Sequence, residues 1–108
     1  MYVDPADLEG QQLTLKPVGA ADYSVHIFEY TAGRIMLRPA PGNRVVWLWT
    51  ITGPYMPAHL QPSHGEAETL KEAKIAFRAK FDSWLAWAKE LQHPVAWTGG
   101  GTRAPSAQ

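Results

Sequence analysis

Cysteine is absent from this sequence of 108 residues, which excludes disulfide bonds, thiolate nucleophiles and cysteine-ligated zinc. Net charge is absent as well, because ten Lys and Arg residues balance ten Asp and Glu residues. That balance removes the general attraction that a basic domain has for nucleic acids and anionic membranes, although it does not exclude a local basic patch. No apolar run approaches the ~18 residues of a membrane-spanning helix, so we expect no membrane partner.

Sequence signatures of catalysis are also lacking. The chain has four serines, and none of them lies in the Gly-x-Ser-x-Gly motif of serine hydrolases. The triple glycine at 99–101 has no predicted strand before it and no predicted helix after it, unlike a phosphate-binding loop. The acids Glu66, Glu68 and Glu72 surround the start of a predicted helix, where the helix dipole accounts for them. We therefore predict that the protein is not an enzyme and has no cofactor.

Two histidines, His59 and His64, lie five positions apart in a loop that also contains Glu66. Imidazole and carboxylate groups both bind zinc, but this spacing matches no established pattern of metal ligands. We therefore predict no metal site. A metal or small ligand bound by residues 53–68 is kept as the third functional hypothesis.

The composition that remains is typical of one packed domain, because 45% of the residues are apolar and five are tryptophan. Residues 1–12 include acidic residues and no apolar run, unlike a signal peptide, so we expect a cytoplasmic location. We divide the chain into three parts. These are an N-terminal segment (1–20) with a short helical turn and a short strand, a single α+β domain (21–93), and a flexible C-terminal tail (94–108).

Alternation of apolar and polar residues predicts strands in the first half of the domain. Residues 22–39 have the pattern of a hairpin, with a turn at 29–33 in which Gly33 takes a positive φ. Residues 39–43 form the next turn, and residues 44–52 form the third and most apolar strand. The predicted sheet is a three-stranded antiparallel meander, which the N-terminal segment can extend by a fourth strand.

Residues 69–93 have the clearest pattern in the chain, that of one long amphipathic helix. Thr69 and Glu72 match the capping box, in which two side chains satisfy free amides at a helix start. Pro94 disfavours helical geometry at the residue before it and so ends the helix. Residues 53–68 contain three prolines, and we assign them to a long loop between the sheet and the helix.

One face of the predicted strands is almost wholly apolar and matches the apolar stripe of the helix. Packing a sheet face against a helix stripe buries both of them. Because large aromatic side chains dominate core energetics, we assign both tryptophans of the third strand to this interior. The predicted core consists of Val25, Ile27, Ile35, Leu37, Trp47, Trp49, Ile51, Leu70, Phe77, Phe81 and Trp84.

The opposite strand face, which we call the outer face, mixes apolar and cationic side chains. One helix cannot cover both sides of a sheet, so three interpretations stay open. The N-terminal segment or Trp97 covers the apolar part, a second copy or a protein partner packs there, or the face binds a ligand or nucleic-acid backbone. The candidate binding residues are His26, Phe28, Arg34, Met36, Arg38, Arg44, Val46 and Leu48.

Several of these motifs together resemble a group of small uncharacterised bacterial proteins. The shared motifs are Asp22-Tyr-Ser-Val, Gly33-Arg-Ile, Trp47-Leu-Trp and a helix that begins Thr69-Leu-Lys-Glu-Ala-Lys. The likeness covers about residues 22–87 and implies a shared α+β fold without an assigned activity.

The helix start Thr69-Leu-Lys-Glu-Ala is also similar to that of HicB-type antitoxin domains. Those domains have a three-stranded sheet with helices on one face, a topology related to that of double-stranded-RNA-binding domains. The stretch Leu70-Lys-Glu-Ala-Lys also resembles the lysine-rich helix start of that RNA-binding group, and this likeness implies phosphate contacts from Lys71 and Lys74. Leu70 replaces a further lysine of that pattern.

Two functional hypotheses therefore lead. The first is a small non-catalytic interaction module that associates with itself or with a protein partner through the outer face. The alternative is a nucleic-acid-binding module that uses Arg34, Arg38 and Arg44, assisted by Lys71 and Lys74. The alternative predicts an affinity that falls steeply as salt is raised.

Overall fold

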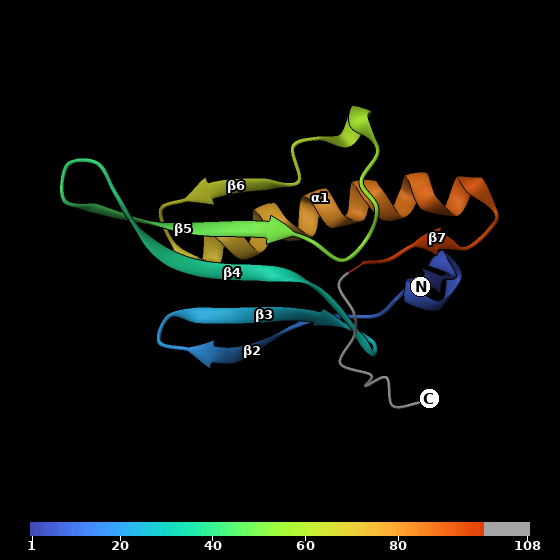
Figure 1. The fold of residues 1–108 in the computed structure, drawn as a ribbon, viewed down its shortest axis with the longest axis horizontal. Helices are drawn as coiled ribbons and strands as arrows, with labels where there is room; N and C mark the ends of the chain where they lie inside the picture. Colours follow the sequence, from blue (N-terminus) through green and yellow to red (C-terminus); the bar gives the residue numbers. More distant parts are fainter. Residues whose placement is uncertain (99–108) are drawn as a thin grey trace.

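The computed structural model describes residues 1–98 and shows a five-stranded sheet with one long helix on one side of it (Figure 1). The strands are antiparallel and lie side by side in their order along the chain. The predicted α+β class and meander are confirmed, and the sheet is larger than predicted. Its strands are β2 (Leu13–Gly19), β3 (Asp22–Ile27), β4 (Tyr30–Ala40), β5 (Arg44–Ile51) and β6 (His64–Ala67).

The two edge strands come from outside the predicted three-stranded meander. β2 belongs to the N-terminal segment, which supplies the fourth strand that the sequence pattern allows. β6 lies within residues 53–68, which the sequence pattern assigns to a loop. Its residues have little strand propensity of their own, and pairing with β5 holds them in place. Gly65 of β6 also leaves room for the Trp49 indole, which would lie 2.8 Å from a Cβ at this position.

The turn between β3 and β4 differs from the prediction. Only Phe28 and Glu29 connect the two strands, and Phe28 has the positive φ, 53°. Gly33 lies inside β4 and is buried. A Cβ at Gly33 would overlap the carbonyl oxygen of Thr50 and come within 2.8 Å of the Phe77 ring. Glycine is therefore required at position 33 because the backbone and the helix side chain approach closely there, not because of a turn.

The helix α1 (Leu70–Leu91) agrees with the predicted helix to within two residues. Thr69 Oγ1 accepts a 3.1 Å hydrogen bond from the Glu72 amide, and the Glu72 carboxylate accepts one of 3.2 Å from the Glu68 amide. The Thr69 bond is the one that the capping box predicts, whereas the Glu72 carboxylate bonds the amide one residue before the cap. Gln92 adopts the left-handed conformation, with φ 58°, and ends the helix.

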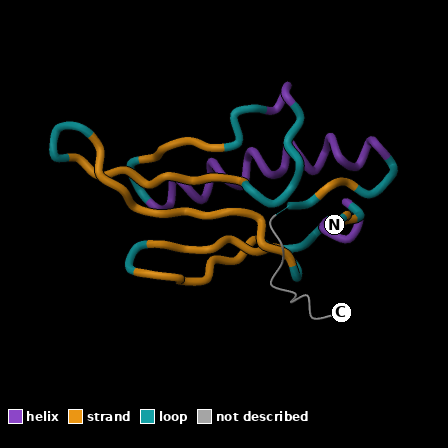
Figure 2. The backbone as a smooth tube through the Cα atoms, in the orientation of Figure 1, coloured by secondary structure: helices purple, strands orange, loops and turns teal. Residues whose placement is uncertain are grey.

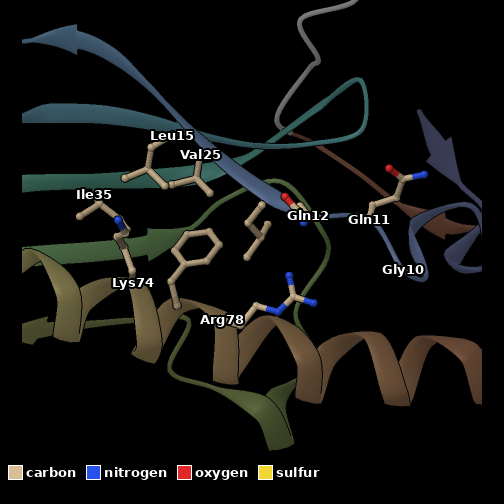
Figure 3. Close-up of a pocket in the computed structure, with 10 residues that line it drawn as sticks. Gly10, Gln11, Gln12, Leu15, Val25, Ile35, Lys74 and Arg78 are labelled. Carbon is tan, nitrogen blue, oxygen red and sulfur yellow. The ribbon is translucent and has the colours of Figure 1, made fainter.

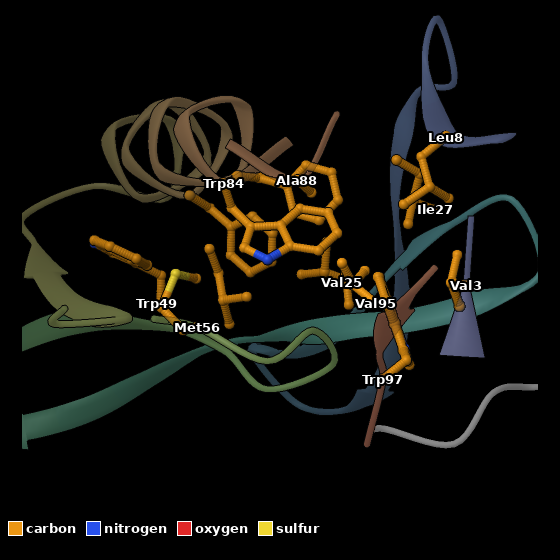
Figure 4. Close-up of a cluster of buried hydrophobic side chains, with 14 of the residues drawn as sticks. Val3, Leu8, Val25, Ile27, Trp49, Met56, Trp84, Ala88, Val95 and Trp97 are labelled. Atoms are coloured by element: carbon orange, nitrogen blue, oxygen red, sulfur yellow. The ribbon is translucent and has the colours of Figure 1, made fainter. Parts of the chain in front are cut away.

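The core lies between α1 and the inner face of the sheet, the face that α1 covers (Figure 4). Leu37 does not belong to this cluster, which corrects one prediction. The β4–β5 hairpin extends beyond the start of α1, so inner-face residues near its end are left uncovered (Figure 1). Trp47 and Leu70 are partly buried against the cluster. The other predicted core residues are buried, namely Val25, Ile27, Ile35, Trp49, Ile51, Phe77, Phe81 and Trp84.

Both ends of the described chain join this core, which corrects the prediction of a flexible tail from residue 94. β1 (Tyr2–Val3) pairs with β7 (Val95–Ala96) in a second small sheet. Trp97 is 1% exposed, and its Nε1 donates a 3.0 Å hydrogen bond to the carbonyl of Thr31. The rest of the predicted tail, residues 99–108, lies outside the described residues.

Two 3₁₀ turns complete the fold of residues 1–98. The first, Pro5–Leu8, is the helical turn predicted near the N-terminus, and the Asp4 side chain caps it by accepting a 3.0 Å bond from the Ala6 amide. Leu8 of this turn is fully buried in the core. The second, Ala58–Leu60, is tied to α1 because Lys80 Nζ donates a 2.9 Å bond to the Leu60 carbonyl.

Candidate functional site

The outer face is the side of the sheet that points away from α1, and α1 leaves it uncovered (Figure 2). The strand register places Met36 opposite Leu48 and Arg38 opposite Val46, as the alternation of residues predicts. Val46 is 3% exposed, and Met36 and Leu48 are partly buried. Met36, Val46 and Leu48 thus form an apolar strip across β4 and β5.

The N-terminal segment and Trp97 do not provide the cover that one interpretation of the outer face requires. Trp97 packs inside the core, where its ring centroid lies 5.9 Å from that of Trp84. β2 lengthens the sheet at its edge by pairing with β3. Neither segment therefore shields the apolar strip.

Two of the three arginines predicted to bind a partner form ion pairs between strands. Arg34 holds Asp22 through two hydrogen bonds, of which the Nε–Oδ1 bond is 2.9 Å long. This bond from Arg34 holds the pKa of the Asp22 carboxyl below its ordinary value. Arg38 Nη2 lies 3.7 Å from Glu66 Oε2, and the register places this pair across β5 between Val46 and Leu48. Arg44 is exposed and has no ion-pair partner within residues 1–98.

Asp22 and Glu66 are site residues that the reasoning from sequence missed. The register places Asp22 opposite Met36, which makes it a diagonal neighbour of Arg34 on the same face. Glu66 lies opposite Leu48 in a strand that the sequence pattern does not predict. With these acids included, the surface around the apolar strip carries three arginines, Arg44 among them, and two acids.

His26 and Phe28 lie away from the apolar strip. Phe28 is in the β3–β4 turn, 52% exposed, with its ring 6.0 Å from that of Tyr30. His26 lies on the outer face between Thr14 and Thr31 and is only 7% exposed. Burial lowers the pKa of His26, with a smaller contribution from the positive charge of Lys16. The structure therefore does not join these two candidates to the others.

The candidate metal ligands are held by separate contacts. The His59 ring lies 6.2 Å from the Trp87 ring, and His64 is in β6 opposite Thr50. Within residues 1–98, no three His, Asp or Glu side chains meet in a way that could hold a metal ion. Over the same residues, no helix has both the length and the apolar character needed to cross a bilayer.

A cavity of about 410 Å³ lies between α1 and the half of the inner face formed by β2 and β3 (Figure 3). It exists because α1 packs mainly over β5 and β6 and leaves the opposite half of the inner face less covered. Apolar side chains from the sheet and the helix form its floor. They are Leu13, Leu15, Val25, Ile35 and Phe77.

The polar groups of this cavity are two cations and two amides. Lys74 and Arg78 extend from one edge of α1 toward the strands, and Gln11 and Gln12 lie at the other side (Figure 3). Arg78 Nε is 3.1 Å from Asp82 Oδ1, in a pair whose partners are both exposed to water. Lys74 has no ion-pair partner within residues 1–98.

The reasoning from sequence named Lys74 as a phosphate contact but missed the cavity. Two signals were available in the chain. Leu13 and Leu15 alternate with polar residues in the predicted N-terminal strand, and Lys74 and Arg78 are four residues apart on one helix edge. Neither signal shows that the two elements leave space between them, because that depends on where the helix crosses the sheet.

In comparisons with known proteins, no family model, no curated protein and no solved structure matches this chain. The resemblance to small bacterial proteins and to HicB-type domains therefore stays a prediction from sequence motifs.

Proposed function

We propose that this protein is a non-catalytic interaction module that pairs with a second copy of itself through the outer face of β4 and β5. The observation that carries the proposal is the apolar strip with an ion pair on each side. From β4, Arg34 reaches toward β3 and Arg38 reaches toward β6. Met36 and Leu48 stay partly exposed at its centre, with Arg34–Asp22 on one side and Arg38–Glu66 on the other.

The charge pattern favours a second copy as the occupant. A dimer with two-fold symmetry places the same surface against itself, so a surface that binds its own copy must be self-complementary. Two arginines and two acids around an apolar strip meet this requirement, because each cation of one copy can face an acid of the other. The Arg38–Glu66 pair is exposed to water and contributes little to the monomer, so it can rearrange at low cost.

The nucleic-acid alternative has less support from the same residues. Asp22 and Glu66 neutralise Arg34 and Arg38, whereas binding to phosphates needs unpaired positive charge. The helix residue Lys74 lies on the inner side of the sheet, so it cannot share one flat surface with these arginines. Arg44 alone of the three arginines has no ion-pair partner within residues 1–98.

Sedimentation equilibrium up to millimolar concentration tests the proposal. We expect concentration-dependent dimers for the wild-type chain and monomers for Leu48→Arg, which places a charge in the strip. Ile75→Arg is the matched control, because Ile75 is an exposed apolar residue, 59% exposed, on α1. It should dimerise like wild type. Thermal unfolding of all three chains checks that each is folded.

A cross-linking experiment avoids any change in stability. The chain has no cysteine, so Met36→Cys introduces a single thiol near the expected two-fold axis. Under mild oxidation this variant should form disulfide dimers much faster than Ile75→Cys. A wild-type chain that stays monomeric at all concentrations, with equal cross-linking of the two variants, would refute self-association. Salt-sensitive binding of duplex or single-stranded nucleic acid in the same samples would favour the alternative instead.

A further inference from the structure

We propose that the cavity between α1 and β2–β3 is a binding site for an amphipathic anion, an apolar chain or ring that ends in a carboxylate. The site lies on the opposite side of the sheet from the outer face. The proposal is therefore independent of self-association.

The floor of the cavity selects an apolar ligand body. Its five side chains are aliphatic or aromatic, and none carries a polar group. The volume of about 410 Å³ falls within the ~300–1,000 Å³ of pockets that hold small molecules. Each methylene group placed there would leave water for apolar surroundings, which favours binding.

The mouth of the cavity selects a negative end group. Lys74 and Arg78 are one helical turn apart and extend over the same opening, and the cavity lining contains no carboxylate. A carboxylate there would give Lys74 the partner that it lacks within residues 1–98. It would also compete for Arg78 with Asp82, whose exposed pair is weak. The side-chain amides of Gln11 and Gln12 can donate further hydrogen bonds.

The cavity is open to solvent at the side where Lys74 and Arg78 lie. Val25, Ile35 and Phe77 are at most 1% exposed, whereas Leu13 and Leu15 are partly exposed, so these two leucines form the accessible part of the floor. The exposed side chains of Lys74 and Arg78 extend from the helix across the opening (Figure 3). Both have long flexible stems that can cover apolar surface and can also rotate away from it. A ligand would enter beneath them and then be held by their charged ends.

Binding can be measured with three probes of equal chain length: decanoate, decanol and decyltrimethylammonium. NMR shifts of the Val25 and Ile35 methyl groups report occupation of the floor, and calorimetry reports affinity. We expect decanoate to bind more tightly than decanol and the ammonium compound to bind weakest. From hexanoate to decanoate, each added methylene should tighten binding about fourfold until the cavity is filled.

Variants separate the two parts of the site. Lys74→Met with Arg78→Met should weaken decanoate about tenfold or more and leave decanol nearly unchanged, because only the charged hydrogen bonds are lost. Lys71→Met is the control, since Lys71 is exposed on α1 but does not line the cavity. Leu15→Trp should fill the space and reduce binding of all three probes.

Two results would overturn the proposal. One is the absence of methyl shifts at Val25 and Ile35 with every probe, which would mean that the cavity takes no apolar ligand. The other is equal affinity for decanoate and decyltrimethylammonium, which would mean that Lys74 and Arg78 select nothing. Loss of dimers in the Leu48→Arg variant leaves both measurements interpretable, because the cavity lies on the other side of the sheet.

Discussion

The indole Nε1 of Trp84, in the middle of α1, donates a 2.8 Å hydrogen bond to the backbone carbonyl of Tyr55, 29 residues earlier in the chain. Trp84 is fully buried, with its ring 5.4 Å from Phe81 and 5.9 Å from Trp97. This one side chain therefore joins the helix, the loop after β5 and the C-terminal segment. A buried indole satisfied in this way contributes both apolar burial and a fixed orientation.

Trp84→Ala should lower the free energy of unfolding by ~3–5 kcal/mol, since the truncation removes a large buried ring and leaves a cavity. Trp84→Phe should cost less, because most of the ring remains. It should still cost ~1–3 kcal/mol, because the Tyr55 carbonyl loses its partner. Urea unfolding of both variants measures these differences. Equal stability of Trp84→Ala and wild type would show that the core is wrongly assigned.

Gly33→Ala should destabilise the protein by ~1–3 kcal/mol or more, because the new methyl group would meet the Thr50 carbonyl oxygen and the Phe77 ring. The backbone oxygen cannot move aside without disturbing the β4–β5 pairing. Gly19→Ala is the matched control, since a Cβ there would be 3.7 Å from the Asp22 Cβ, an ordinary contact. If thermal unfolding shows that Gly19→Ala is less stable than Gly33→Ala, the close approach of Thr50 and Phe77 to Gly33 is contradicted.

Lowering the pH should reduce the stability of the protein because of His26. Burial holds the pKa of this imidazole below its ordinary value of 6.5 in the folded protein. Just below pH 6.5 the unfolded chain therefore binds more protons than the folded chain, and the free energy of unfolding rises with pH. The stabilisation is complete above pH 6.5 and is lost as the pH falls through this value.

The measurement is urea unfolding at several pH values between about 5 and 8, where histidines change charge. His26→Gln should flatten the dependence of stability on pH relative to wild type. His59→Gln should leave it in place, because His26 is retained. A slope that survives in His26→Gln would assign the effect to another group.

Thr69→Ala should lower the free energy of unfolding by ~1 kcal/mol, within the ~0.5–2 kcal/mol range for loss of a helix cap. The Glu72 amide would lose the hydroxyl that accepts its hydrogen bond. Thr69→Ser keeps the hydroxyl and should stay close to wild type, and Thr14→Ala, at an exposed strand position, controls for loss of a threonine elsewhere. If Thr69→Ser is as destabilised as Thr69→Ala, the hydroxyl is not the stabilising group.

Reasoning from the sequence located the helix, the central strands and most of the core, because each is encoded by a local period. The positions of Phe77, Phe81 and Trp84 follow the helical repeat, and those of Ile35 and Trp49 follow the alternation of a strand. All five are buried as predicted. The capping residue Thr69 also acts on its near neighbours alone, so its role could be predicted.

The candidate sites could be predicted only in part. Alternation placed Met36, Arg38 and Leu48 on the outer face, as the register shows. It could not show that Arg34 and Arg38 pair with Asp22 and Glu66, because those contacts depend on which strands become neighbours. The two acids pair with two of the three arginines, which leaves Arg44 as the arginine of this surface without an ion-pair partner within residues 1–98.

What the sequence by itself determined is therefore the set of elements with a repeating apolar pattern and the face that each one buries. Only the tertiary structure decided the edge strand β6, the place of β2 beside β3, the pairing of β1 with β7, and the burial of Trp97. It alone decided the cavity, since α1 crosses the sheet off centre, over β5 and β6. The physical reason is the separation along the sequence over which each interaction acts. Periodicity and caps act within one or two turns of chain, whereas these features depend on contacts between segments far apart in sequence.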